Sequence, residues 1–519
     1  MLPALPILQR APHRSFFSGS HYNPHFLISR NAYRLREGAP GEITSTLEFG
    51  LTHIHENTHW FQHVGTTYGA FMDALRSSQK MSLLRGLRGL PRSKRRRLFD
   101  DRMKGGRPFI EIDAQTQYMK ESRAVDPAIG IVKQIWFDHQ WLHASFDDSK
   151  AVGKLGFPPV DACANVVADV ILNCCDTHEF ESSDFELGAH IDARRWYFEG
   201  ESELSETLVE LDGKIQHLTS TGLMECAASL NELQYLQDNA FSVIAPVEHQ
   251  RIAQLRLEEF EKSSYSIPFK LYRETAKNAC IPHEIFLLSL NLLIFFALNP
   301  PLPPRVLHRP SRSWRWEDVY PPHRFLAGLA ILDQIDGIKD AEAITEMRRF
   351  IADISDASGL PYCGEASLPA RRYTINDWNK ESETPNSNML IDDVLTTEAQ
   401  FRLAGIADRL PLLANFASCL TGDLSRKFAR VLFPDETRYD FLGPPLEFLK
   451  DGKIGFRGTA AFGNNIVRSV AVSAGFFEFA CGTGVISFED LPKEVDLDRK
   501  MFRFVKSQLR QMITETDNI

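Results

Sequence analysis

The feature that most constrains the fold is a long segment without proline, residues 42–90, in which apolar side chains recur at helical spacing. A proline inside a helix removes a backbone hydrogen bond and clashes with the preceding turn, so its absence allows many continuous turns. One stripe at positions i, i+4, i+7, i+11 and i+14 consists of Leu47, Leu51, Ile54, Thr58 and Phe61. We therefore expect a helix from Glu42 to Leu75 whose stripe faces the core.

Six further segments show the same period of about 3.6 residues, which is typical of amphipathic helices. They are Leu218 to Phe241, Pro246 to Glu261, Pro282 to Leu298, Ala341 to Ile354, Thr397 to Leu420 and Lys493 to Thr514. Strand-like patches are few and short, and residues 453–457 and 467–472 are examples. The pattern predicts a mainly α protein, an α+β fold with minor β structure.

A proline-rich stretch, residues 299–313, contains five prolines and no acidic residue. Such a composition is typical of a semi-rigid spacer. We predict one domain over residues 1–298, a linker over 299–313 and a mainly helical C-terminal region over 314–519. The longest apolar run, Ile285 to Leu298, is shorter than the roughly 20 residues that span a bilayer, so it predicts a buried helix and no membrane span.

Charge and cysteine content narrow the class of protein. The formal net charge is −10, which argues against general binding to nucleic acid. The eight cysteines include no CxxC pair and no spacing typical of a disulfide framework. The first residues lack the basic segment that begins a secretory signal. We expect a reducing, cytoplasmic location.

A dense basic segment, residues 85–107, interrupts this acidic background with the sequence RGLRGLPRSKRRRLFDDRMKGGR. Its glycines and proline predict an exposed loop or short helix inserted between packed elements. The simplest interpretation is a solvated surface segment. The alternative is that Arg92 to Arg107 binds an acidic partner.

The sequence His55-Glu56-Asn57-Thr58-His59 falls within the first predicted helix and has the pattern H-E-x-x-H. Residues four apart on a helix lie about 40° apart and one turn along, so both imidazoles can reach one ion. We predict that His55 and His59 bind zinc as neutral imidazoles. Glu56 would face the open coordination position and act as general base toward a metal-bound water.

Neighbouring positions on the same helix face suggest supporting roles. Glu48 and Gln62 share the face of the two histidines, and we expect Glu48 to accept a hydrogen bond from the second ring nitrogen of one ligand. A third histidine six residues after the second is excluded because that position is Gly65. His63 lies about 80° around the helix from His55 and is a weaker candidate ligand.

A catalytic zinc site needs a third protein ligand, and two glutamates compete for that role. Glu225 follows a Ser/Thr cluster that can cap a helix, and small residues after it would allow close helix packing. Glu199, with Glu203 one turn later, is the alternative. An acidic surface run explains Glu199 more simply than Glu225, so we favour Glu225.

With these residues, the chain resembles the zincin metallopeptidases, specifically the gluzincins with two histidines and one glutamate. The matching segments are HENTH at residues 55–59 and MECAASLNE at residues 224–232. The resemblance implies Zn²⁺ as cofactor, Glu225 as third ligand and a zincin-like helical catalytic core. It departs from the family where Cys226 replaces a common glycine and Ser229 replaces an acid one turn after the ligand.

The expected function is therefore that of a zinc-dependent hydrolase, a metallopeptidase that acts on a peptide or protein substrate. Candidates for stabilising the oxyanion are Tyr197, Tyr235 and His217, by proximity in the sequence alone. The alternative is a non-catalytic regulatory or partner-binding protein with a structural or degenerate metal site. A second pair at the same spacing, His139 and His143, lacks the intervening glutamate and indicates packing.

Overall fold

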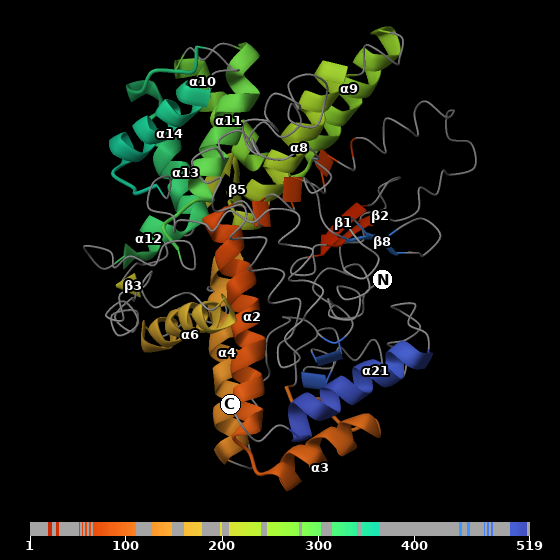
Figure 1. The fold of residues 1–519 in the computed structure, drawn as a ribbon. Coiled ribbons are helices and arrows are strands. Elements are labelled where there is room, and N and C mark those ends of the chain that lie inside the picture. The colour runs from red at the N-terminus through yellow and green to blue at the C-terminus, as the bar shows by residue number, and fades with distance from the viewer. Residues whose placement is uncertain are drawn as a thin grey trace.

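The structure is a computed structural model, which Figure 1 shows as a ribbon. The residues it describes are 19–22, 27–30, 51, 54–55, 58–59, 62–63, 66–110, 127–147, 160–178, 198–199, 207–239, 246–279, 283–302, 314–339, 344–362, 446–448, 454–456, 472, 475–476, 479–480 and 499–515. Most of these residues are helical. The prediction of a mainly α protein with minor β structure is confirmed.

The helices account for most of the packing. They are α2 (Thr67–Arg88), α3 (Arg92–Met103), α4 (Pro127–Asp147), α6 (Val160–His178), α8 (Ser220–Asn239), α9 (Pro246–Lys262), η2 (Ser264–Ser266), α10 (Ile267–Ala279), α11 (His283–Ala297), α12 (Trp316–Val319), α13 (Pro321–Ala330), η3 (Leu332–Gln334), α14 (Ile344–Ser358), α21 (Arg499–Arg510) and η5 (Gln511–Glu515). The predicted helix from Thr397 to Leu420 lies outside the described residues.

Three small sheets contain the strands. The strands are β1 (Gly19–Tyr22), β2 (Leu27–Arg30), β3 (Phe198–Glu199), β4 (Leu208–Leu211), β5 (Lys214–His217), β6 (Trp314–Arg315), β7 (Leu446–Phe448) and β8 (Ile454–Phe456). One sheet has the order β1-β2-β7-β8, in which β2 and β7 are parallel, and the others pair β3 with β6 and β4 with β5. The β4–β5 hairpin turns at Asp212 and Gly213, both with positive φ, as a two-residue turn requires. It leads directly into α8.

The first predicted helix is not continuous. Leu51, Ile54 and Thr58 are helical and buried, as their stripe predicts. Thr66, however, has extended backbone angles, and its side chain accepts a hydrogen bond from the backbone N–H of Gly69. Thr66 therefore caps a new helix, α2, and the prediction of one helix through Leu75 is wrong here. A threonine hydroxyl satisfies an N–H group that would otherwise lack a partner at a helix start.

Helix α11 lies at the centre of the hydrophobic core. Residues 288–300 are all buried, which confirms the predicted buried helix. One cluster of buried side chains extends from Tyr68 to Leu360 and includes α8, α10, α11, α13 and α14. None of the helices in the described part of the chain is long and apolar enough to cross a membrane.

The start of the proline-rich stretch packs on the beginning of α2. Asn299 Oδ1 accepts the backbone N–H of Thr67 at 3.1 Å, and the Leu298 carbonyl accepts that of Tyr68 at 3.1 Å. These acceptors satisfy N–H groups in the first turn of α2. Residues 303–313 lie outside the described residues, and the division into domains stays a prediction.

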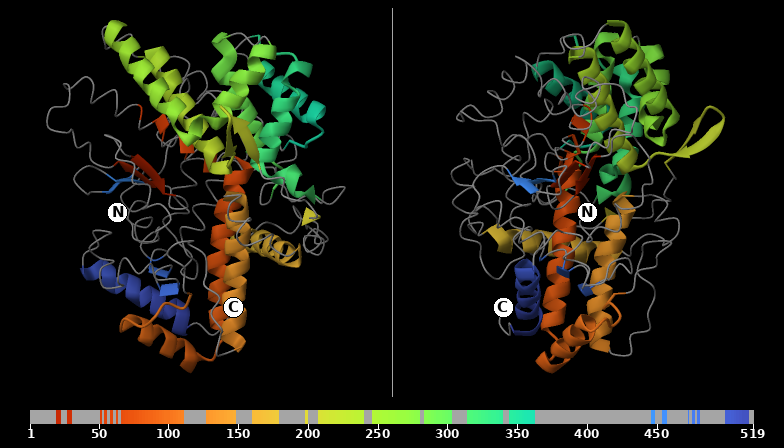
Figure 2. Two further views of the ribbon diagram at one scale, coloured as in Figure 1. Left: turned by 180° about the vertical axis from the view of Figure 1, so that it is seen from behind. Right: turned by 90° about the vertical axis from the view of Figure 1, so that its right-hand side faces the viewer.

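Helices α2 and α4 form a long pair that runs from the α8–α14 helices down to α3, side by side in both views of Figure 2. Its interior is partly polar. His139 is 1% and His143 6% exposed, so both belong to the core. Arg76 Nε donates to His143 Nε2 at 2.8 Å, and Ser78 Oγ lies 3.1 Å from His139 Nε2.

The two buried histidines predict that the protein is less stable at acidic pH. Burial lowers the pKa of both histidines; for His143 the charge of Arg76 lowers it further, whereas the Ile135 carbonyl and Asp169 partly oppose the shift at His139. Below the unfolded-state pKa of about 6.5, the unfolded chain therefore binds more protons than the folded one. We expect stability to fall from pH 7 to pH 5, by up to about 1.4 kcal/mol per pH unit for each histidine. Urea denaturation at pH 7 and pH 5 measures the free energy of unfolding. In His143→Gln, this free energy should depend less on pH than in the wild type. An equal pH dependence in that variant would contradict the role given to His143.

The basic segment is more structured than its composition predicts. It comprises the end of α2 and all of α3, which pack against η5. Arg88, Arg92 and Arg95 donate from their guanidinium groups to the carbonyls of Met512, Thr514 and Ile513, at 3.1, 3.2 and 3.2 Å respectively. Carbonyls in the last turn of a helix lack intrahelical donors, and arginine supplies them.

The expectation of a solvated segment is thus wrong for Arg95, which is 2% exposed. Arg96, Arg97, Lys104 and Arg107 are exposed, as expected. An acidic partner of Arg92 to Arg107 could therefore contact the exposed side chains of α3 and of the residues that follow it.

Candidate metal centre

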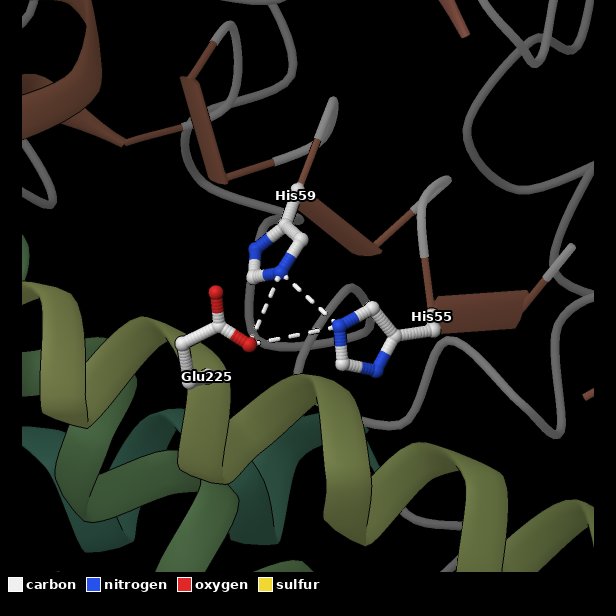
Figure 3. Close-up of side chains that lie close together, drawn as sticks. All are labelled: His55, His59 and Glu225. Atoms are coloured by element: carbon white, nitrogen blue, oxygen red, sulfur yellow. Dashed lines mark hydrogen bonds and ion pairs between the residues drawn. The ribbon is translucent and has the colours of Figure 1, made fainter. Parts of the chain in front are cut away.

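Three side chains from two distant segments of the chain converge at one point (Figure 3). His55 Nε2 and His59 Nε2 lie 3.1 Å apart. Glu225 Oε2 lies 3.3 Å from His55 Nε2 and 3.5 Å from His59 Nε2. The side chains of His55, His59 and Glu225 keep 20%, 12% and 23% of their surface exposed, so the cluster is open to solvent on one side.

The spacing of the three atoms fits a small metal ion. In tetrahedral zinc sites with ligand distances of about 2.0–2.1 Å, neighbouring ligand atoms are about 3.3 Å apart. The three separations, 3.1, 3.3 and 3.5 Å, scatter around that value. Two imidazole nitrogens and one carboxylate oxygen are also a donor set that zinc accepts. The group could therefore hold a metal ion.

Helix α8 presents Glu225 as its sequence predicts. Thr219 Oγ1 accepts the N–H of Gly222 at 2.9 Å, so the Ser/Thr cluster does cap the helix. Cys226 and Ala228 are fully buried and Ala227 is 7% exposed, so small side chains line the packed side of α8 beside the ligand. Burial also raises the pKa of the Cys226 thiol, so the thiol stays protonated and packs as a small apolar side chain.

The alternative ligand, Glu199, has a different place in the fold. It lies in β3, in register with Arg315 of the parallel strand β6. Among the described residues, the group that could hold a metal consists of His55, His59 and Glu225 and does not include His63; the side chain of Glu199 is not described. The structure therefore brings together the set that the sequence favours.

The second ring nitrogen of each histidine has its own partner. His59 Nδ1 lies 2.9 Å from Gln62 Oε1, and Gln62 Nε2 donates to the Met224 carbonyl at 2.9 Å. His55 Nδ1 lies 2.5 Å from Glu232 Oε1. Both partners orient an imidazole so that Nε2 faces the cluster, the arrangement that metal-binding histidines usually show.

Glu232 contacts the cluster, and the sequence alone did not single it out. The predicted acceptor was Glu48, which lies outside the described residues. Glu232 follows Glu225 by seven positions, which is almost two full turns, so both carboxylates lie on one face of α8. That spacing was the signal that could have identified it.

A chain of buried amide and hydroxyl groups fixes the helix that carries His55 and His59, here called the histidine helix, against α8. Thr58 Oγ1 donates to the Ile54 carbonyl at 2.8 Å and accepts from Asn231 Nδ2 at 3.1 Å. Asn231 Oδ1 in turn accepts from Asn291 Nδ2 of α11 at 3.2 Å. Because each buried group needs its partner, these bonds specify one register between the two helices.

Charges around the cluster shift its pKa values in a consistent way. Burial alone would lower the pKa of His55, but its hydrogen bonds with Glu225 and Glu232 outweigh burial and raise that pKa well above its ordinary value. Burial would raise the pKa of Glu225, yet the charge of His59 and hydrogen bonds from both histidines lower it. The carboxylate is therefore ionised, the form that binds a metal.

Tyr265 is a second residue that sequence reasoning did not single out. It lies in η2, which packs on α8, and burial together with the negative charge of Glu225 raises the pKa of its phenol. Of the sequence-predicted oxyanion candidates, Tyr197 lies outside the described residues and the side chain of Tyr235 is not described. His217 ends β5, three residues before α8 begins. Glu56, the predicted general base, also lies outside the described residues.

Fold and site together define a mainly helical protein with a His-His-Glu cluster able to hold a metal ion. Comparisons of the chain with models of known protein families, with curated proteins and with solved structures find no match.

Proposed function

We propose that the protein is a zinc-dependent hydrolase of the metallopeptidase class. His55, His59 and Glu225 would hold Zn²⁺, and Glu56 would act as general base. The observation that carries the proposal is the triangle of three ligand atoms, 3.1–3.5 Å apart, formed by two helices that are distant in sequence.

The number of ligands favours a catalytic site over a structural one. Structural zinc sites are usually closed by four protein ligands, whereas catalytic sites have three and leave one position to water. Among the described residues, the cluster has three members, and Glu232 contacts His55 through the ring nitrogen that points away from the other ligands. Bound zinc would supply a water of lowered pKa and polarise a carbonyl group.

The chain's own residues would provide orientation and proton transfer. Gln62 and Glu232 hold the two imidazoles, and the negative charge of Glu232 increases the basicity of His55. Glu56 would accept the proton of the attacking water and pass it to the leaving amine, a role that rests on its position between the two histidines. Tyr265 lies in η2, which packs on α8, and its phenol keeps its proton at neutral pH, so it is the candidate donor to the developing oxyanion.

A reducing, cytoplasmic location belongs to the same proposal. Cys163 and Cys226 are buried cysteines. Burial raises the pKa of Cys163 to about 12, so both thiols are protonated and unreactive at neutral pH.

Removal and return of the metal test the function directly. The purified full chain should contain about one zinc per molecule, as expected for a single three-ligand site. Mass spectrometry would measure hydrolysis of a mixed peptide library. Dialysis of the protein against a chelator should abolish this hydrolysis, and added Zn²⁺ should restore it. Zinc should also raise the melting temperature, because a ligand that binds only the folded state stabilises it. Absence of metal and of any melting shift would instead favour the regulatory or partner-binding alternative.

A further inference from the structure

We infer that Gln62 is a positioning residue that determines which ring nitrogen of His59 carries a proton. It does so while α8 is packed against the segment that contains Gln62. The inference rests on the proposed function, because it concerns the same metal centre. It adds a role for a side chain three residues after the second histidine, which the H-E-x-x-H pattern does not include. Gln62 is 7% exposed, so its amide must find partners inside the protein.

The polarity of the two hydrogen bonds determines the orientation of the imidazole. The Met224 carbonyl can only accept, so the NH₂ group of Gln62 must face it, at 2.9 Å. The amide oxygen then faces His59 Nδ1, also at 2.9 Å, and can only accept. Nδ1 of His59 must therefore carry a proton, so in the neutral imidazole the lone pair is on Nε2, the atom that faces Glu225 and His55.

The acceptor on α8, the Met224 carbonyl, is adjacent to the third ligand. Met224 immediately precedes Glu225, so the backbone segment that presents the carboxylate also orients Gln62. If α8 moves away, Gln62 loses its anchor and can rotate to offer its NH₂ group to His59. The tautomer suited to metal binding is thus coupled to the docking of the helix that completes the site.

Close packing holds the other side of Gln62. A Cβ atom built on Gly69 would lie 2.3 Å from the Gln62 carbonyl oxygen and 2.4 Å from His63 Cα, both backbone atoms. Only glycine permits this approach of the start of α2 to the end of the histidine helix. Gln62 is therefore fixed from two sides, by α8 through its side chain and by α2 through its backbone.

The test compares Gln62→Met with Gln79→Met in the full chain. Methionine keeps the length of the side chain but accepts only weakly and cannot donate, so zinc affinity should fall 10- to 100-fold in Gln62→Met, as for loss of other outer partners of metal-binding histidines. Gln79→Met makes the same change at a buried glutamine that donates to the Trp136 carbonyl between α2 and α4, and it should lower stability while leaving zinc affinity unchanged. Zinc affinity is measured by competition with a chelator, and the visible spectrum of the Co²⁺-loaded protein reports the geometry of the site.

We expect an altered Co²⁺ spectrum for Gln62→Met and a wild-type spectrum for Gln79→Met. Wild-type affinity and spectrum in folded Gln62→Met would overturn the inference. If that variant does not fold, Gln62→Glu decides: it retains the acceptor for His59 and should keep affinity within tenfold, so a larger loss would refute the role. Failure of the wild-type chain to bind zinc would refute the proposed function itself, which distinguishes the two.

Discussion

Glu225→Gln should abolish both zinc binding and hydrolysis. The substitution preserves shape but replaces an ionised carboxylate with a neutral amide, so it removes the only negative charge among the three proposed ligands. We expect zinc affinity to fall by more than the 10- to 100-fold that loss of an outer partner costs. Hydrolysis should fall to background, because the remaining histidines would hold the metal weakly. Chelator competition and peptide hydrolysis measure the two effects separately.

Glu199→Gln is the matched control for this variant. It makes the same chemical change at the other glutamate that the sequence offers as third ligand. If His55, His59 and Glu225 are the ligands, zinc affinity and activity of Glu199→Gln should equal those of the wild type. The reverse pattern, with zinc retained in Glu225→Gln and lost in Glu199→Gln, would show that the third ligand is Glu199.

Local periodicity explains why much of the site could be predicted. His55 and His59 are four residues apart on one helix, so the geometry of a single turn brings them together in any fold. The stripe of Leu51, Ile54 and Thr58 defines the buried side of that helix. Glu225 could be favoured because small and apolar neighbours indicate a packed helix. These inferences need only the spacing along the chain.

Contacts between distant segments could not be predicted in the same way. Glu232 contacts His55 across 177 positions, and Gln62 contacts the Met224 carbonyl across 162. Either contact requires the register of two helices, which depends on buried amides such as Asn231. A backbone carbonyl as partner also leaves no trace in the sequence, since every residue has one.

The fold differs from the sequence prediction at helix ends, where a side chain forms a hydrogen bond with a backbone group that lacks a partner inside the helix. Apolar spacing continues through Thr66, but the threonine hydroxyl satisfies Gly69 N–H and begins a new helix. Arg95 lies in a basic segment whose composition is typical of a protein surface. Its guanidinium nevertheless donates to the Ile513 carbonyl, 418 positions away. Charge predicts exposure only when no unsatisfied backbone group lies within reach.

Glu56→Gln should separate metal binding from chemistry. The substitution leaves His55, His59 and Glu225 unchanged, so zinc content and melting temperature should match the wild type. A glutamine cannot accept a proton, and loss of a general base typically costs 10²- to 10⁴-fold in rate. We expect kcat to fall within that range while KM changes little, because Glu56 would act in the transition state rather than in substrate binding.

Glu232→Gln provides the comparison that makes this result specific. It also removes a carboxylate near the metal, but one that acts through His55, so zinc affinity should fall 10- to 100-fold and added zinc should restore much of the activity. Excess zinc should not rescue Glu56→Gln, since its site is already filled. Full activity in zinc-loaded Glu56→Gln would refute the role of Glu56, and zinc rescue of that variant would place Glu56 among the groups that hold the metal. On the proposed mechanism, the two glutamates would therefore act on different steps, Glu56 on proton transfer and Glu232 on the orientation of a ligand.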